Sequence, residues 1–177
     1  MQKPQFAPAV LGEYDPRWIE IFNKEKKAIT DAIGEYVESI EHIGSTAILG
    51  IKAKPEIDIL IGVGDIGKIS PVIDLLSSIG YVYFPKFEEF VPERRYFIKS
   101  EGIVPLVHIH MVETKSDFYR DHILFRDYLR NHPEDAQRYE RLKEELIEEF
   151  NGERDGYTEG KVGFIKEILV KAAKHGL

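Results

Sequence analysis

Residues 54–63 read KPEIDILIGV, the pattern of a buried β-strand that begins at a proline and carries acids at its near end. Its Ile, Leu and Val content is typical of a strand covered on both faces. Because side chains alternate along a strand, Glu56 and Asp58 are expected on one face, roughly 6–7 Å apart at their α-carbons. This spacing favours a site for a cation or a phosphate. The alternative is that Glu56 lies at a solvated strand end and Asp58 meets Lys52 or Lys54.

Working outward from this strand, the pattern predicts a mixed α/β (α+β) fold, with a sheet flanked by helices. We expect helices over about 15–33 and 70–80, and strands near 37–43, 81–84, 95–99 and 106–112, the last two antiparallel. Three further helices are expected over 116–130, 133–150 and 158–174. We therefore divide the chain into an α/β core, 1–114, and a helical unit, 115–177, that packs on the core without a flexible linker.

A Gly-Ser-Thr turn at Gly44, Ser45 and Thr46 follows the strand near 37–43. Glycine lets the backbone approach a ligand closely, amides at a following helix start attract phosphate, and the two hydroxyls add donors. A plain turn is the alternative, because this tripeptide is common in loops. His42, just before it, either lines the same cleft or supports the turn.

His108 and His110 share one face of the strand near 106–112 with Leu106 and Val112. Two imidazoles at this spacing can reach one metal ion placed by a neighbouring strand. A pair of hydrogen-bonded structural histidines is the alternative. Together with Glu56 and Asp58, they predict a site for a divalent cation.

Basic residues near these strands are candidates for phosphate binding, and Arg94, just before the strand at 95–99, is one of them. Arg95 and Lys99 are an even number apart and are expected to face the cleft together, while Lys54 flanks the acidic strand. Such cations neutralise phosphate groups during transfer. Ordinary surface solvation is the competing interpretation for each of them.

Composition excludes several classes of protein. The chain of 177 residues has no cysteine, which excludes disulfides, thiolate zinc sites and cysteine nucleophiles. Its net charge of −7 argues against general nucleic-acid binding, and no strong nucleic-acid signal is present. No signal peptide and no apolar run of ~20 residues is found, so we expect a cytoplasmic protein without a membrane partner. Monomer and homodimer are equally compatible with its size.

Several separated blocks together resemble the GrpB (UPF0157) family of the nucleotidyltransferase-like superfamily. The blocks are Tyr14–Trp18, Glu41–Ala47, Lys54–Leu60, His108-x-His110, Leu124–Arg130, Tyr139-x-x-Leu142-Lys143 and, more loosely, Asp155 with Tyr157. The resemblance implies that Gly44 and Ser45 contact nucleotide phosphates and that the strand acids bind Mg²⁺. The chain departs from this pattern by placing His108 or His110 where a third acid is usual, which favours Mn²⁺ or Zn²⁺. Glu56 also stands where similar chains often have an aliphatic residue.

Two functions follow from this resemblance. The first is a metal-dependent nucleotidyltransferase in which Asp58 and Glu56 are the catalytic acids and hold the cation, helped by His110. The second is a module that binds a nucleotide or a CoA-type ligand without catalysis, which the missing third acid favours. A metal-dependent phosphohydrolase ranks last, because its usual motifs are absent. In the first two cases the partner is a nucleotide or a nucleotide-containing small molecule.

Overall fold

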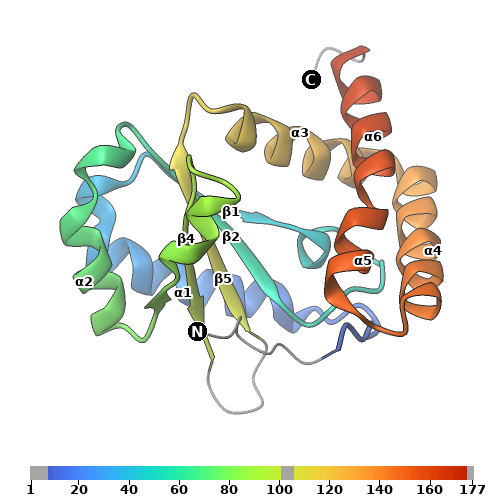
Figure 1. Ribbon diagram of the computed structural model, residues 1–177, viewed down its shortest axis with the longest axis horizontal. Helices are drawn as coiled ribbons and strands as arrows, with labels where there is room; N and C mark the ends of the chain where they lie inside the picture. Colours follow the sequence, from blue (N-terminus) through green and yellow to red (C-terminus); the bar gives the residue numbers. More distant parts are fainter. Residues whose placement is uncertain (1–7, 101–105, 175–177) are drawn as a thin grey trace.

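The computed structural model describes residues 8–100 and 106–174. Its centre is a five-stranded sheet in the order β1-β2-β5-β4-β3 (Figure 1). The strands are β1 (Ser39–Ile43), β2 (Ile57–Val63), β3 (Val82–Tyr83), β4 (Arg95–Lys99) and β5 (Val107–Glu113). β2 and β5 run parallel and every other neighbouring pair is antiparallel, so the sheet is mixed as expected.

One face of the sheet is covered by α1 (Arg17–Ile33) and α2 (Ser70–Ser78). The main core forms there, because alternate residues of the strands meet the apolar stripes of both helices. Its buried members include Trp18, Phe22, Ile29, Ile33, Ile57, Ile59, Ile61, Val72, Leu76, Phe97, Val107, Ile109 and Met111. This face therefore takes the odd-numbered side chains of β2, β4 and β5, and the even-numbered ones project from the opposite face.

The opposite face is covered at one end by α3 (Asp117–Asn131), whose Phe118, Tyr119 and Ile123 pack on Ile43, Leu60 and Val112. Ser116 caps this helix by accepting a hydrogen bond from the Tyr119 amide at 3.2 Å. Beyond α3, helices α4 (Pro133–Glu149) and α6 (Val162–Lys174) share a smaller core. Asn151 (φ 49°) and Gly152 (φ 75°), just after α4, have left-handed backbone conformations. Most of the chain thus follows the predicted order of elements.

The last predicted helix is wrong in one respect: the structure has two helices, α5 (Arg154–Gly160) and α6 (Val162–Lys174), in place of one from Thr158. α5 begins earlier because the Glu153 carboxylate accepts hydrogen bonds from the amides of Asp155 and Gly156 at 2.8 and 2.7 Å. α5 packs so closely on α4 that a Cβ at Gly160 would overlap the Leu146 side chain. The connection between the two antiparallel strands expected near 95–99 and 106–112, which the sequence Ser100-Glu101-Gly102 predicts to turn, extends outside the described residues. The division of the chain after residue 114 stays a prediction.

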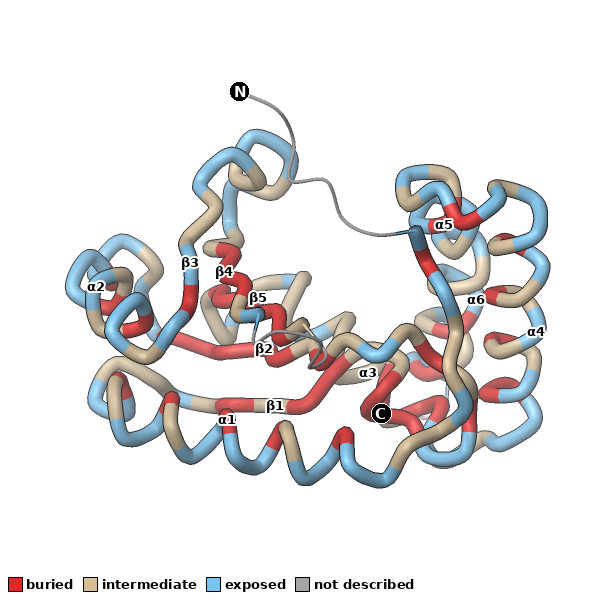
Figure 2. The backbone as a smooth tube through the Cα atoms, turned by 90° about the horizontal axis from the view of Figure 1, so that it is seen from below, coloured by how far each residue is buried: buried red, intermediate tan, exposed pale blue. Residues whose placement is uncertain are grey.

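The segment before α1 connects the sheet to the C-terminal helices. The Ala9 amide donates to the Gly152 carbonyl at 2.9 Å, and Gly12 forms an isolated antiparallel bridge with Ala53. Ala9 is buried against Leu146 and Tyr157. Figure 2 shows the segment that connects β3 to β4 on one side of the molecule and α5 on the other. Within the described residues, no helix has the length and apolar composition needed to cross a membrane.

Candidate functional site

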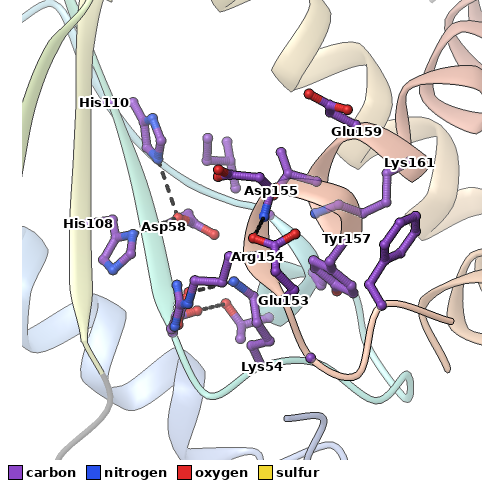
Figure 3. A pocket seen from close by; sticks show the side chains of 18 of the residues that line it. Lys54, Asp58, His108, His110, Glu153, Arg154, Asp155, Tyr157, Glu159 and Lys161 are labelled. Atoms are coloured by element: carbon purple, nitrogen blue, oxygen red, sulfur yellow. Dashed lines mark hydrogen bonds and ion pairs between the residues drawn. The ribbon is translucent and has the colours of Figure 1, made fainter. Parts of the chain in front are cut away.

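A cavity of about 1190 Å³ opens between the even-numbered face of the sheet and the C-terminal helices. Its lining comes from five parts of the chain, at 43–46, 54–58, 87–96, 108–110 and 150–161, with Pro8, His122 and Tyr139 added. Figure 3 shows the strand side chains on one side and those of α5 on the other. The cavity thus lies where α3 leaves the sheet uncovered.

Asp58 lies on the sheet side of this cavity, beside the two predicted histidines. The parallel register places Asp58 opposite His108, and Leu60 opposite His110, so the three polar side chains share one face. His110 Nε2 lies 3.3 Å from Asp58 Oδ1, and His108 Nδ1 lies 3.8 Å from the same oxygen (Figure 3). The structure thus brings Asp58 and both imidazoles together in one cavity beside the Gly-Ser turn, and their roles there stay predictions.

Each histidine also forms a hydrogen bond with a residue in β4 or just before it. The Tyr96 hydroxyl is 2.8 Å from His108 Nδ1, and Arg94 Nη1 is 3.3 Å from His110 Nδ1. Since a guanidinium only donates, His110 Nδ1 accepts, and its Nε2 carries the proton that is donated to Asp58. In this tautomer His110 Nε2 has no lone pair for a metal ion.

The pKa values around Asp58 favour a fixed negative charge. Burial by itself raises the pKa of the Asp58 carboxyl, but the hydrogen bond and charge interaction with His110, aided by His108 and Lys54, lower it overall. Burial lowers the pKa of His108, partly opposed by Asp58. A carboxylate whose pKa is lowered in this way is a weak general base. It is a good partner for positive charge, because its ionised form is the stabilised one.

The Gly-Ser turn contacts Asp58 directly. Gly44 has φ 72° and ψ −174°, a conformation that is essentially restricted to glycine, and a Cβ there would overlap the Asp58 carboxylate. Burial raises the pKa of Tyr139, and a hydrogen bond with Ser45 opposes this shift. Thr46 Oγ1 donates to the Glu56 carbonyl at 3.1 Å. Both hydroxyls therefore have partners within the protein, and their predicted contact with phosphate stays a prediction.

His42 supports this turn from the opposite face of the sheet. Its Nε2 lies 3.0 Å from Thr46 Oγ1, and its ring stacks on Phe22 with centroids 4.8 Å apart. Burial lowers the pKa of His42 to about 4, so the ring is neutral at physiological pH. Of the two interpretations given above, the structure favours support of the turn.

Glu56 has a different environment from Asp58. It directly precedes β2, and its carboxylate is bound by Lys54 Nζ at 2.9 Å and by Arg154 Nη2 at 2.7 Å. Burial raises the pKa of Glu56, but Lys54, His108 and Arg154 outweigh it and lower the value overall. Glu56 thus joins the sheet to α5 through an ion-pair network.

This pairing bears on the predicted cation. Across residues 8–100 and 106–174, no three His, Asp or Glu side chains are arranged to hold a metal ion. Glu56 is engaged by two cations, and His110 directs a proton toward Asp58. The groups present do not fit an ion held by protein side chains alone, and binding of Mg²⁺, Mn²⁺ or Zn²⁺ stays a prediction.

The prediction that Arg95 and Lys99 face the cleft is wrong. They share a face with each other, but it is the odd-numbered face that packs on α1 and α2, and neither residue lines the cavity. Arg95 pairs with Glu88 at 3.2 Å, and Lys99 pairs with Glu25 of α1 at 3.1 Å. The even spacing of Arg95 and Lys99 correctly predicted that they share one face of β4. It could not predict that this face is the one opposite the cavity.

The basic residues that do line the cavity are Lys54, Arg94, Arg154 and Lys161. Of these, the sequence pointed to Lys54 and to Arg94, whereas Arg154 and Lys161 were not predicted. Lys161 follows α5, and its Nζ lies 4.3 Å from the centre of the Tyr157 ring. Tyr157 is buried. It belongs to the loosely matching block at 155–157, which was the only feature of the sequence that pointed to α5 as part of the cavity wall.

The fold and the cavity define a class: an α+β protein with a mixed sheet, whose polar pocket is closed by C-terminal helices. The family model described as GrpB protein matches residues 8–171. The chain therefore belongs to the GrpB family. The expectation from the quoted blocks is thereby confirmed at the level of the family.

Relatives and a solved structure agree with this placement. The glutamate-rich protein GrpB of Alkalihalophilus pseudofirmus is 37% identical over 164 residues, covering 90% of this chain and 93% of that protein. The UPF0157 protein YqkA of Bacillus subtilis is 39% identical over 153 residues, which are 86% of this chain and 44% of YqkA. The crystal structure of the conserved protein GrpB from Enterococcus faecalis has a TM-score of 0.81 at 33% identity, covering 94% of this chain and 98% of that one.

Proposed function

We propose that the cavity binds the phosphate groups of a nucleotide or of a nucleotide-containing small molecule such as a CoA-type ligand. The observation that carries this proposal is a pair of cations, Arg94 and Lys161, that line one cavity from different parts of the fold. Within the described residues, neither forms an ion pair with a carboxylate. Burial lowers the pKa of both, and the charge of Asp58 opposes this shift only in part. A bound phosphate would give each cation an anion in direct contact.

The local geometry of Arg94 supports this role. Its guanidinium lies 4.8 Å from the Tyr96 ring centre and 5.8 Å from that of Phe118, so aromatic rings hold it in place. Its Nε is buried, and within the described residues no hydrogen bond satisfies it. A guanidinium that is held in one position at the cavity wall is well suited to phosphate oxygens.

Binding without catalysis is the version that the geometry supports best. Glu56, predicted as a catalytic acid and metal ligand, is committed to Lys54 and Arg154, and no metal cluster is preassembled in the described residues. Nucleotidyl transfer is the second candidate, and the observation favouring it is the ionised Asp58 held against Gly44 in the same cavity. The acceptor and the nucleotide would then both occupy this cavity.

Calorimetric titration with nucleoside triphosphates, pyrophosphate and CoA tests the binding proposal, in EDTA and again with Mg²⁺ or Mn²⁺. Arg94→Gln should weaken binding about tenfold or more, because a hydrogen bond to a charged group contributes about 1.5–3 kcal/mol. Arg95→Gln is the matched control, because this neighbouring arginine faces away from the cavity and should change nothing. Absence of binding across the panel, or equal effects of the two substitutions, would contradict the proposal.

Release of pyrophosphate from a nucleoside triphosphate in Mg²⁺ or Mn²⁺ tests the transfer reaction. If transfer occurs, Asp58→Asn should abolish it while nucleotide binding and folding persist. Unchanged turnover in that variant would remove Asp58 from the reaction.

A further inference from the structure

Two phenylalanines before β4 form an aromatic part of the cavity wall. Phe87 lies on the short helix η4 (Pro85–Glu89) and Phe90 follows it, and both line the cavity. Phe90 is 71% exposed, although its ring belongs to a concave surface. We infer that Phe87 and Phe90 are a stacking platform for a planar ring, and that the ring is the base of the nucleotide whose phosphates the proposed function places in this cavity.

The Phe87 ring and the backbone that carries Phe90 are held in place before any ligand arrives. The Phe87 ring packs edge-on against Tyr96, with centroids 4.9 Å apart at 70°, and against Phe84 at 6.3 Å. The amides of Phe90 and Val91 both donate to the Phe87 carbonyl, at 3.3 and 3.1 Å. Aromatic rings that are already ordered lose little conformational entropy when a flat ligand stacks on them.

A single exposed phenylalanine is ordinary on a protein surface, so its position carries the argument. The same segment continues to Arg94, whose amide donates to the Val91 carbonyl at 3.0 Å. One short stretch of chain therefore presents both a ring surface and the cation assigned to phosphate. That combination matches a nucleotide, which joins a flat base to phosphates through one sugar.

The cavity is also large enough to hold a ligand bigger than a phosphate group. Its volume of about 1190 Å³ is at or above the upper end of the ~300–1,000 Å³ typical of pockets for drug-sized ligands. Stacking on an aromatic ring accepts any base, because every base has a π-face. We therefore expect the platform to bind any of the bases. Discrimination among the bases would have to come from other groups in the cavity.

The experiment separates the ring from the phosphate by using probes that contain only one of them. Saturation-transfer NMR and calorimetry are performed with adenosine and uridine, which lack phosphate, and with pyrophosphate, which lacks a ring. At millimolar concentration the wild-type protein should bind at least one nucleoside, and Phe90→Ala should weaken this binding about fivefold or more. Pyrophosphate binding should be unchanged in that variant. Leu49→Ala is the control, because Leu49 is 72% exposed and lies outside the cavity lining.

The possible outcomes keep the two proposals apart. If the wild-type protein binds neither nucleoside, or if Phe90→Ala binds as well as Leu49→Ala does, the platform is overturned whatever happens with pyrophosphate. If pyrophosphate fails to bind while nucleosides bind in a Phe90-dependent manner, the platform stands and the phosphate site is wrong. Since Phe90 is exposed, its truncation should leave the fold intact, which circular dichroism checks.

Discussion

Gly44 lies directly against the carboxylate of Asp58, so closely that a Cβ at residue 44 would overlap Oδ2 of that side chain. The close approach links the turn after β1 to the first polar residue of β2. It holds Asp58 between the turn on one side and the two imidazoles of β5 on the other. The position of Asp58 in the cavity therefore depends on residue 44 having no side chain.

Gly44→Ala should lower the free energy of unfolding by about 1–3 kcal/mol, because its φ of 72° with ψ of −174° is costly for any other residue. It should also displace Asp58 and reduce any activity that needs this carboxylate. Urea denaturation measures the first effect. Gly163→Ala is the control, since a Cβ there meets no atom within 4 Å, and in a helix it should be neutral or stabilising by up to ~1 kcal/mol. Equal stability of the two variants would contradict the assigned strain.

A buried lysine makes the stability of the protein depend on pH near neutrality. Lys143 of α4 is 0% exposed, its Nζ donates to the Lys52 carbonyl, and it lies 4.9 Å from the Tyr139 ring centre. Burial, with the nearby charge of Lys161, lowers its pKa to about 7 from the ordinary 10.5. Between these two values the unfolded chain binds more protons than the folded protein does, so stability rises with pH across this window.

Lys143→Met should remove that rise. Relative to the variant, the wild-type protein should gain stability from pH 7 to pH 9, about 2 kcal/mol in all, and the difference should be nearly flat below pH 6. Urea denaturation at pH 5.5, 7, 8 and 9 measures it. Parallel stability curves for the two proteins over the whole range would show that Lys143 does not titrate in this window.

The ion pair between Glu56 and Arg154 should hold α5 against the sheet. Its side chains are only 12% and 22% exposed, so Arg154→Gln should cost about 1–3 kcal/mol, more than a surface pair does. Hydrogen exchange should show faster exchange of the α5 amides in particular. Arg120→Gln is the control, because its pair with Asp117 is largely exposed and should contribute at most ~1 kcal/mol. Unchanged exchange in α5 would show that other contacts hold this helix.

Manganese should bind only together with a nucleotide. Asp58 supplies a carboxylate, but no cluster of three ligands is formed in the described part of the chain, so the remaining ligands would have to come from phosphate oxygens. Enhancement of water proton relaxation by Mn²⁺ should need both protein and nucleoside triphosphate, and Asp58→Asn should abolish it. Tight Mn²⁺ binding without nucleotide that is lost in His110→Ala would instead support the metal site predicted from the sequence.

The strand residues of the site were predictable because alternation along a strand is a local property. It placed Asp58 on one face of its strand and both histidines on one face of theirs, and the structure brings the three together. For Arg95 and Lys99 the same rule failed, because the face of β4 depends on its register with β5. That register pairs Tyr96 with His110, which directs Arg95 and Lys99 to the opposite face.

The helical wall of the cavity was not predictable by such rules. Arg154, Tyr157 and Lys161 follow Asp58 by about a hundred residues, and only tertiary packing brings them to the sheet. Their positions depend on the break between α5 and α6, which periodicity did not reveal. Glu56 shows the same limit, because its partner Arg154 is 98 residues away.

The attachment of Ala9 to Gly152 has a practical consequence for preparing the protein. Pro8, next to this attachment, lines the cavity itself. An affinity tag fused on the N-terminal side would therefore join the described chain at the cavity wall, and a polyhistidine tag would bring its own metal and anion affinity to any ligand measurement. Ligand screens should use a tag that is cleaved off or carried at the other end of the chain.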